Sequence, residues 1–163
     1  MSILQLRASD PTLSTWVSAS AGTGKTKILT DRVLRLLLQN VPFNKILCLT
    51  FTNAAANEMQ ERIIAQLEKW SHSSQEDLID SLQNTLGRKP TKDELIKASS
   101  LFELYLKTQD QINIYTIHSF CQKILKKFPL EAGISPHFKI IDEFKVNKII
   151  RDIKRQIFNL PEI

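Results

Sequence analysis

The N-terminal part of the chain alternates between strand-like and helix-like hydrophobic patterns. Thr15–Ser18 has the pattern of a short buried strand, and a loop of small residues follows at Ala19–Gly24. Lys25–Gln39 is predicted to be a helix because apolar residues recur at helical spacing, at Leu29, Val33, Leu36 and Leu37. Ile46–Phe51 is an apolar run of strand length, which is typical of a parallel strand covered on both faces. These segments predict a strand-helix-strand unit.

Helical patterns dominate the middle of the chain. A helix is predicted from Ala54 to about Trp70, and the polar segment Ser71–Asp77 after it is predicted to be a loop. A short helix follows, with apolar residues at Leu78, Leu82 and Leu86 and a left-handed stop at Gly87. We expect residues 71–110 to form a helical insertion rather than part of the sheet.

The C-terminal part combines a capped helix with a second strand-helix unit. Thr91 and Glu94 have the spacing of a capping box, which predicts a helix through about Lys107. Ile112–Thr116 alternates like a strand, and the helix after it ends before Pro129. One more short strand is predicted at Phe138–Ile141. A final amphipathic helix is predicted from apolar residues at helical spacing, at Val146, Ile149, Ile150, Ile153 and Ile157.

Composition adds a modest constraint. The 163 residues are 42% hydrophobic, enough for one domain-sized core. No apolar run reaches the roughly 18 residues of a membrane span, so we expect a cytoplasmic protein without a membrane partner. The formal charge of +5 favours polyanionic partners. Charged residues on solvated helix faces, however, give a similar net charge in proteins that bind no nucleic acid. Cys48 and Cys121 are predicted to be reduced, buried thiols.

A phosphate-binding pattern joins the first predicted strand to the first long helix. The residues are Ala19, Ser20, Ala21, Gly22, Thr23, Gly24, Lys25 and Thr26, with Ala in place of the usual first Gly. Glycines let successive backbone N–H groups turn toward an anion, and the start of a helix adds its positive dipole end. Lys25 is predicted to reach the β and γ phosphates of a nucleotide, and the Thr26 hydroxyl to ligate Mg²⁺. A dinucleotide fingerprint is excluded, because its third glycine is missing.

Three further segments resemble motifs of UvrD/Rep-type superfamily 1 DNA helicases. They are Gln5-Leu6-Arg7-Ala8, the segment from Leu49 to Met59, and Thr116-Ile117-His118-Ser119-Phe120-Cys121. Together with the sequence from Trp16 to Thr26, these segments are most similar to the AddA-type subunit of bacterial helicase-nucleases. The resemblance implies that residues 1–163 form the N-terminal part of a helicase ATP-binding domain. The implied fold is α/β, a partial RecA-like P-loop NTPase domain with parallel strands and covering helices.

The resemblance also implies individual roles. Gln5 would bond the adenine edge of ATP, and Thr52, Asn53 and His118 would contact single-stranded or unwinding DNA, with attraction from Lys123, Lys126 and Lys127. Each assignment has a simpler alternative that the sequence leaves open. Gln5 can be an ordinary exposed glutamine, Thr52-Asn53 only the N-cap of the next helix, and His118 a helix-start residue bonded to backbone.

Several parts of such a motor are missing from the sequence. Hydrolysis needs an acidic pair that holds Mg²⁺ and arginines from a second lobe, which the remainder of a helicase would supply, together with a nuclease subunit. Ile141–Phe144 superficially resembles the acidic motif, but its spacing and ending differ, and an N-cap by Asp142 is favoured. The expected function is an ATP-binding, DNA-contacting helicase segment that cannot hydrolyse ATP alone. The alternatives are a non-catalytic remnant that binds weakly and a small-molecule phosphotransferase.

Overall fold

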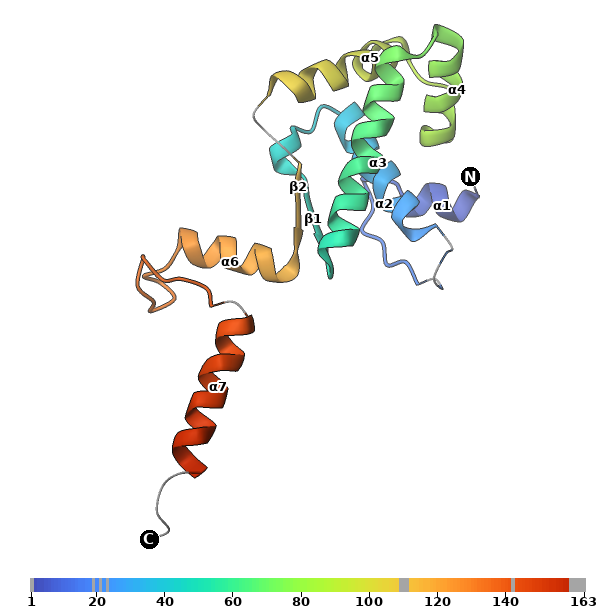
Figure 1. Cartoon of the computed structure of the whole chain (residues 1–163). Coiled ribbons are helices and arrows are strands. Elements are labelled where there is room, and N and C mark those ends of the chain that lie inside the picture. The colour runs from blue at the N-terminus through green and yellow to red at the C-terminus, as the bar shows by residue number, and fades with distance from the viewer. Residues whose placement is uncertain are drawn as a thin grey trace. The chain divides into compact units, whose positions relative to one another are not determined.

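The computed structural model describes residues 2–18, 20, 22, 24–108, 112–141 and 143–158 (Figure 1). The chain divides into two compact units, residues 1–121 and 122–163, and each is described on its own. In chain order the elements are α1 (Ile3–Ala8), α2 (Lys25–Leu38), the 3-10 helix η1 (Phe43–Lys45), β1 (Leu47–Thr50), α3 (Asn53–His72), α4 (Gln75–Leu86), α5 (Lys92–Lys107), β2 (Asn113–Thr116), α6 (Ile117–Lys127) and α7 (Glu143–Phe158).

The helices begin and end where their capping residues predict. The Thr52 side chain accepts from Ala55 N at the start of α3, and Thr91 and Glu94 form the expected capping box of α5. Gly87 ends α4 with φ 74°, the left-handed conformation that favours glycine. The helices expected from Lys25, Ala54 and Thr91 are therefore confirmed, each to within a few residues.

The predicted loop at Ser71–Asp77 is wrong. Helix α3 continues to His72 and α4 already begins at Gln75, so only two serines separate them. The Ser74 hydroxyl caps α4 by accepting from Asp77 N at 3.2 Å. Two acidic residues in the first turn also favour the positive end of this helix dipole. Polar residues that suggest a loop therefore serve here as a helix start.

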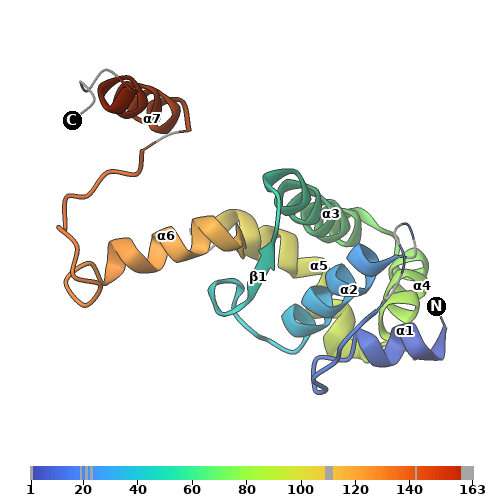
Figure 2. The same ribbon diagram turned by 90° about the horizontal axis from the view of Figure 1, so that it is seen from below.

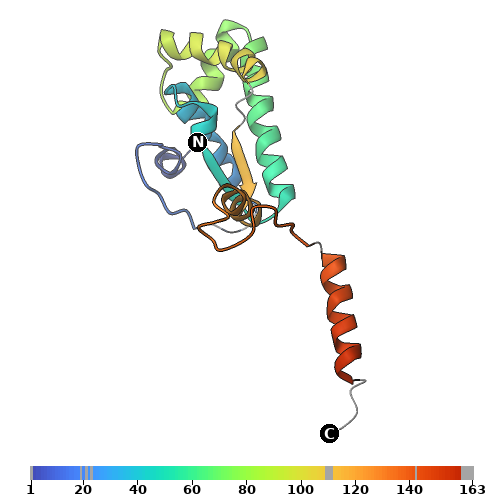
Figure 3. The ribbon, with the colours of Figure 1, turned by 90° about the vertical axis from the view of Figure 1, so that its left-hand side faces the viewer.

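The sheet of the first unit has two parallel strands in the described residues. β1 pairs with β2 in a register that runs from Leu47 opposite Asn113 to Thr50 opposite Thr116. Both strands were expected from the sequence and are confirmed. Figure 3 shows α3 running alongside the strand pair, so that α3 covers one face of the sheet. This arrangement is consistent with a partial α/β domain of the RecA type.

The core of the first unit lies mainly between helices. Trp70 is 0% exposed, and its indole Nε1 donates to Ser81 Oγ at 2.9 Å, which links α3 to α4. The other buried residues of this hydrophobic cluster come from five helices and from the residue that follows η1. They are Val33, Leu34, Leu37 and Leu38 of α2, Phe43 of η1, Ile46 after it, Met59, Ile63 and Leu67 of α3, Leu78 and Leu82 of α4, and Ala98 and Leu101 of α5. The apolar stripes of these helices therefore face one another, as their spacing predicts.

The second face of β1 is open, in contrast to the expectation of a strand covered on both faces. Leu49 is 46% exposed and Leu47 is similarly exposed, whereas Cys48 between them is half-buried and packs against the hydrophobic core. A shallow apolar cavity of about 270 Å³ lies between β1 and α2. Side chains alternate across a strand, so one set of residues is left at the surface.

The strand expected at Thr15–Ser18 is not formed. These residues are extended without strand pairing, and the Trp16 side chain is 95% exposed. A central parallel strand needs hydrogen-bonding neighbours, and in the described residues β1 pairs only with β2. A strand-like sequence is therefore not sufficient, because the pairing edge must also be present.

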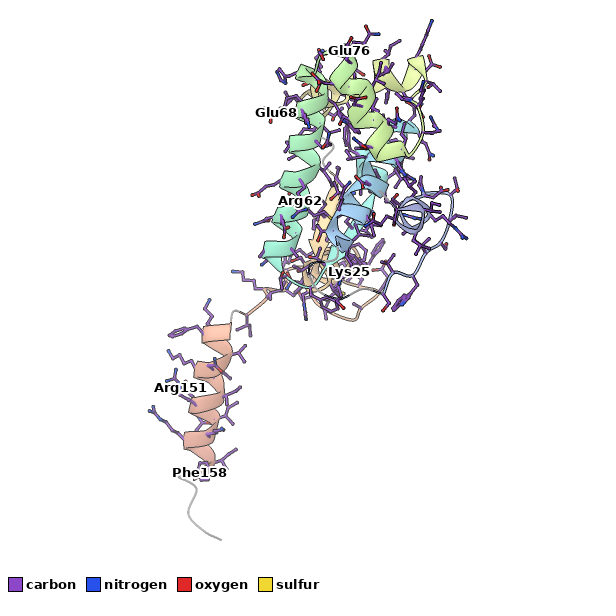
Figure 4. All side chains as sticks on the ribbon, turned by 90° about the vertical axis from the view of Figure 1, so that its right-hand side faces the viewer. Lys25, Arg62, Glu68, Glu76, Arg151 and Phe158 are labelled. Carbon is purple, nitrogen blue, oxygen red and sulfur yellow. The ribbon has the colours of Figure 1, made fainter. Side chains whose placement is uncertain are left out.

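The second unit contains most of α6 and the separate helix α7. The strand predicted at Phe138–Ile141 is wrong, since this segment is irregular. The final amphipathic helix is confirmed as α7, from which Arg151 and Phe158 project in Figure 4. Asp142, the expected N-cap, lies outside the described residues. Glu143 and Phe144 are helical because α7 begins at Glu143, and Ile141 is irregular, so these three residues are not in the strand that an acidic metal-binding motif requires.

The cysteines and the hydropathy of the helices complete the description. Cys48 is half-buried and Cys121 is exposed, so the expectation of two buried thiols is wrong for Cys121. Burial raises the pKa of the Cys48 thiol to about 11. Among the residues that the structure describes, no helix is both long and apolar enough to cross a bilayer.

Candidate functional site

The phosphate-binding pattern lies at the start of α2, where two glycines adopt left-handed conformations. Gly22 has φ 80° and Gly24 has φ 88°, and an added Cβ at either position would meet no atom within 4 Å. The backbone conformation itself therefore requires glycine here. Ala19, Ala21 and Thr23, which the sequence also assigns to this site, lie outside the described residues.

Lys25 closes this segment into a turn. Its ammonium Nζ donates to the Ser20 carbonyl at 2.7 Å, across five residues of sequence. Gly24 is the N-cap of α2 and offers no side-chain cap, and the first turn of the helix contains no acidic residue. The helix start therefore combines its own dipole with the cation of Lys25, an environment that favours an anion.

Thr26 follows Lys25 in the first turn of α2 and is half-buried. Its hydroxyl is the only metal ligand that the sequence assigns to this site. Among the described residues, no group of three or more His, Cys, Asp or Glu is arranged to hold a metal ion. A Mg²⁺ ion commonly keeps several waters and takes few protein ligands beside phosphate oxygens, so a single hydroxyl fits that chemistry.

A cavity of about 450 Å³ adjoins the start of α2 at Lys25. Its walls come from the segment before the turn and from one face of α2: Ala8, Ser14, Thr15, Val17, Lys25, Ile28, Leu29 and Arg32. The walls are mainly apolar and Lys25 lies at the edge. A hydrophobic cavity beside a cationic turn has the character of a small-ligand site.

Arg32 fixes the outer wall of this cavity. Its guanidinium donates to the carbonyls of Asp10 and Leu13, both at 2.6 Å, and more weakly to Ala8 O at 3.4 Å. Three carbonyls of an irregular segment are thereby held to α2. Sequence reasoning missed this residue, because an arginine at a helical position resembles any solvated side chain.

Gln5 lies on α1 and is already engaged in a local interaction. Its Oε1 accepts from Ser2 N at 3.0 Å, and the Ser2 hydroxyl accepts from Gln5 N, which makes a capping box. The side chain is half-buried rather than fully exposed. To read an adenine, the Gln5 amide would exchange this capping bond for bonds to the base.

The residues expected to contact DNA meet at one edge of the sheet. The paired strands end at Thr50 and Thr116, and Thr52 and His118 each follow two residues later. The carboxyl ends of parallel strands lie at the same sheet edge, so Asn53 also lies there. Figure 4 shows Lys25 at the same end of the unit as the start of α3.

Local hydrogen bonds decide between the simpler alternatives at this edge. Thr52 is the N-cap of α3 and accepts from Ala55 N at 3.1 Å, while Asn53 is exposed. Thr116 Oγ1, not His118, accepts from the Ser119 backbone at the start of α6. Thr52 therefore caps α3, and its contact with DNA stays a prediction. The Asn53 and His118 side chains are exposed at the surface.

Phe51 is an additional residue at this edge that sequence reasoning missed. It ends the apolar run predicted to be a buried strand, yet 88% of its side chain is exposed. An exposed aromatic ring at the end of a strand gives a surface on which bases can stack. Lys123, Lys126 and Lys127 belong to the second unit, so their relation to this edge stays a prediction.

The family follows from sequence comparison. Residues 4–162 match the family model described as the UvrD/REP helicase N-terminal domain. The chain belongs to this family. The resemblance stated from the motifs is thereby confirmed, and so is the partial α/β class that it implied.

Individual relatives agree with this assignment, and each is named as one of the subunits of an ATP-dependent helicase/nuclease. The chain is 32% identical over 151 residues to the relative from Clostridium kluyveri, covering 91% of the chain and 10% of that protein. The relative of the same name from Natranaerobius thermophilus is 34% identical over 140 residues, 84% of the chain and 9% of the relative. The relative from Pediococcus pentosaceus is 29% identical over 150 residues, which cover 90% of the chain and 11% of that relative. The chain thus spans about a tenth of the length of these curated relatives.

Proposed function

We propose that this chain is the ATP-binding, DNA-contacting segment of an ATP-dependent DNA helicase. The observation that carries the proposal is the glycine turn at Gly22 and Gly24, which leads into α2 with Lys25 folded back onto it. Family membership supports the same conclusion, because the match covers residues 4–162.

In this proposal the turn from Ala19 to Thr26 holds the triphosphate of ATP. Lys25 gives up its contact with Ser20 O to bind the β and γ phosphates, and Thr26 contributes one oxygen to Mg²⁺. When bound, the ion would screen the phosphate charge. Gln5 reads the adenine from α1, and the cavity walled by Arg32 accommodates the base or ribose.

The carboxyl edge of the sheet is the proposed contact with single-stranded DNA. Asn53 and His118 offer polar groups for the DNA backbone, and Thr52 holds the start of α3 in place for them. The relatives are named as helicase/nuclease subunits, so we propose that the chain works with the remainder of such a motor and with a nuclease subunit, in the cytoplasm. Hydrolysis would require residues supplied by those parts.

Titration with a fluorescent ATP analogue and Mg²⁺ tests the nucleotide site. Lys25→Ala is expected to weaken binding about 10- to 100-fold, since it removes a charge-assisted bond to phosphate. Lys69→Ala is the control, because Lys69 is likewise a helical lysine but is exposed on α3. Equal affinity of the Lys25→Ala and unsubstituted chains would remove the site assignment. Robust DNA-stimulated ATP hydrolysis by the chain alone would show that it needs no residues from the rest of a helicase for that reaction.

Fluorescence anisotropy with a labelled oligothymidine tests the DNA edge. Asn53→Ala and His118→Ala are each expected to weaken binding about three- to tenfold, as for loss of one hydrogen bond. Asn57→Ala is the matched control, since Asn57 is exposed one turn further along α3. If Asn57→Ala weakens binding as much as Asn53→Ala, the sheet edge is not the DNA contact.

A further inference from the structure

Arg35 connects three helices of the first unit through one buried guanidinium. It lies on α2 and is 7% exposed. Its Nε and Nη2 donate to Thr85 O at 2.9 and 2.8 Å, and its Nη1 donates to Leu6 O at 3.1 Å. Thr85 is in the last turn of α4 and Leu6 in the last turn of α1. One side chain thus joins α1, which carries Gln5, to α4.

The chemistry of these bonds explains why an arginine occupies this position. The last four carbonyls of a helix lack partners within it and form the negative end of its dipole. A guanidinium has five N–H donors in a rigid fork, so it can bond carbonyls of two helices at once. Burial lowers the pKa of Arg35, and the carboxylates of Asp31 and Asp10 oppose that shift. The group remains charged throughout the physiological pH range.

A second contact presses α1 against the same end of α4. A Cβ added to Gly87 would overlap the Leu6 side chain at Cδ2 and Cδ1. The left-handed residue that ends α4 is therefore also the surface on which Leu6 rests. Figure 2 shows α1 beside α2 and α4 in this part of the unit.

We infer that Arg35 is a positioning residue that sets the location of Gln5 through Leu6 and thereby contributes to the preference of the nucleotide site for ATP over GTP. Gln5 immediately precedes Leu6 on α1, which has less than two turns, so the helix can move only as a body. Helix α4 then supports Gln5 through Arg35 and Leu6 without touching the nucleotide. This inference rests on the proposed nucleotide site.

The test measures dissociation constants for fluorescent ATP and GTP analogues with the full chain. Gln5→Ala and Arg35→Met are each expected to reduce the ATP-over-GTP ratio about three- to tenfold, the worth of about one hydrogen bond. The double variant is expected to lose no more than the larger single loss, because both changes remove the same contact to adenine. Arg62→Met is the matched control, an exposed arginine paired with Glu58 on α3, and it should leave the ratio unchanged.

The outcomes separate a positioning role from a merely structural one. A structural arginine would weaken both nucleotides equally, so an unchanged ratio in Arg35→Met overturns the inference, as do additive losses in the double variant. If Arg35→Met fails to fold by circular dichroism, Gly87→Ala replaces it, since its methyl displaces Leu6, and the same loss of ratio is expected. An unsubstituted chain that binds both nucleotides equally also overturns the inference. Absence of Lys25-dependent binding instead overturns the proposed function itself.

Discussion

The helical part of the first unit and its sheet bury their apolar residues to different extents. Trp70, Ile63 and Leu67 of α3 are completely inaccessible, whereas Leu47 and Leu49 of β1 have nearly half of their surface exposed. Amphipathic helices close a core by packing against their sequence neighbours, α4 and α5. A strand needs partners on both edges and layers on both faces, which sequence neighbours do not supply. The candidate site lies at the less covered end, where loops rather than core residues carry the chemistry.

The two tryptophans should give the largest contrast between these regions. Trp70→Ala is expected to lower the free energy of unfolding by about 3–5 kcal/mol, because it leaves a cavity and removes the bond to Ser81. Trp16→Ala should change it by less than about 0.5 kcal/mol, since that side chain is 95% exposed. Urea unfolding followed by circular dichroism measures both. Equal losses would mean that Trp16 is buried within a more complete sheet.

Two leucines, Leu67 in α3 and Leu49 in β1, test the same difference in burial between the helices and the sheet. Leu67→Ala in α3 should cost about 2–5 kcal/mol, and Leu49→Ala in β1 less than about 1 kcal/mol. The residue type and the substitution are identical, so only the environment differs. Thermal unfolding of the two variants in parallel gives the comparison. A Leu49→Ala loss as large as that of Leu67→Ala would contradict the open face of β1.

A smaller effect is expected at the capping box of α5, within the helical region. Arg88 donates to both Glu94 oxygens, at 2.9 and 2.6 Å, and these bonds lower the pKa of Glu94 to about 2. The ordinary glutamate value is 4.5, so this stabilisation is complete above that pH and is lost as the pH falls toward 2. Glu94→Gln should therefore cost about 1 kcal/mol at pH 7 and progressively less as the pH falls from 4.5 through 2, measured by urea unfolding. A cost independent of pH would contradict the ionised cap.

The thiols should differ in reactivity rather than in stability. Cys121 is exposed, whereas Cys48 is half-buried in β1 with its pKa raised to about 11, so little thiolate forms near pH 8. Ellman's reagent should label one thiol rapidly. Cys121→Ser should remove that fast phase and Cys48→Ser should leave it intact. Fast labelling of Cys48 would indicate that solvent reaches both faces of β1.

The spacing of hydrophobic residues and the capping residues predict most of the helices from the sequence alone. Met59, Ile63 and Leu67 predicted α3, and Thr91 with Glu94 predicted the start of α5, because both signals depend on residues within a few positions. The segments at Thr15–Ser18 and Phe138–Ile141 failed as strands, since pairing depends on distant residues. The glycine turn at the proposed nucleotide site was also predictable locally, because Gly22 and Gly24 adopt positive φ angles that favour glycine.

The sequence by itself determined the family, the helices and the residue types of the candidate site, because these are written in short motifs and periodic patterns. Only the tertiary structure paired Thr50 with Thr116, the strand ends that precede Thr52 and His118. It alone joined Arg35 to Leu6 and Thr85, which are 29 and 50 positions away in sequence. The physical reason is that a guanidinium has no sequence signature for its acceptors, which become neighbours only when the helices pack.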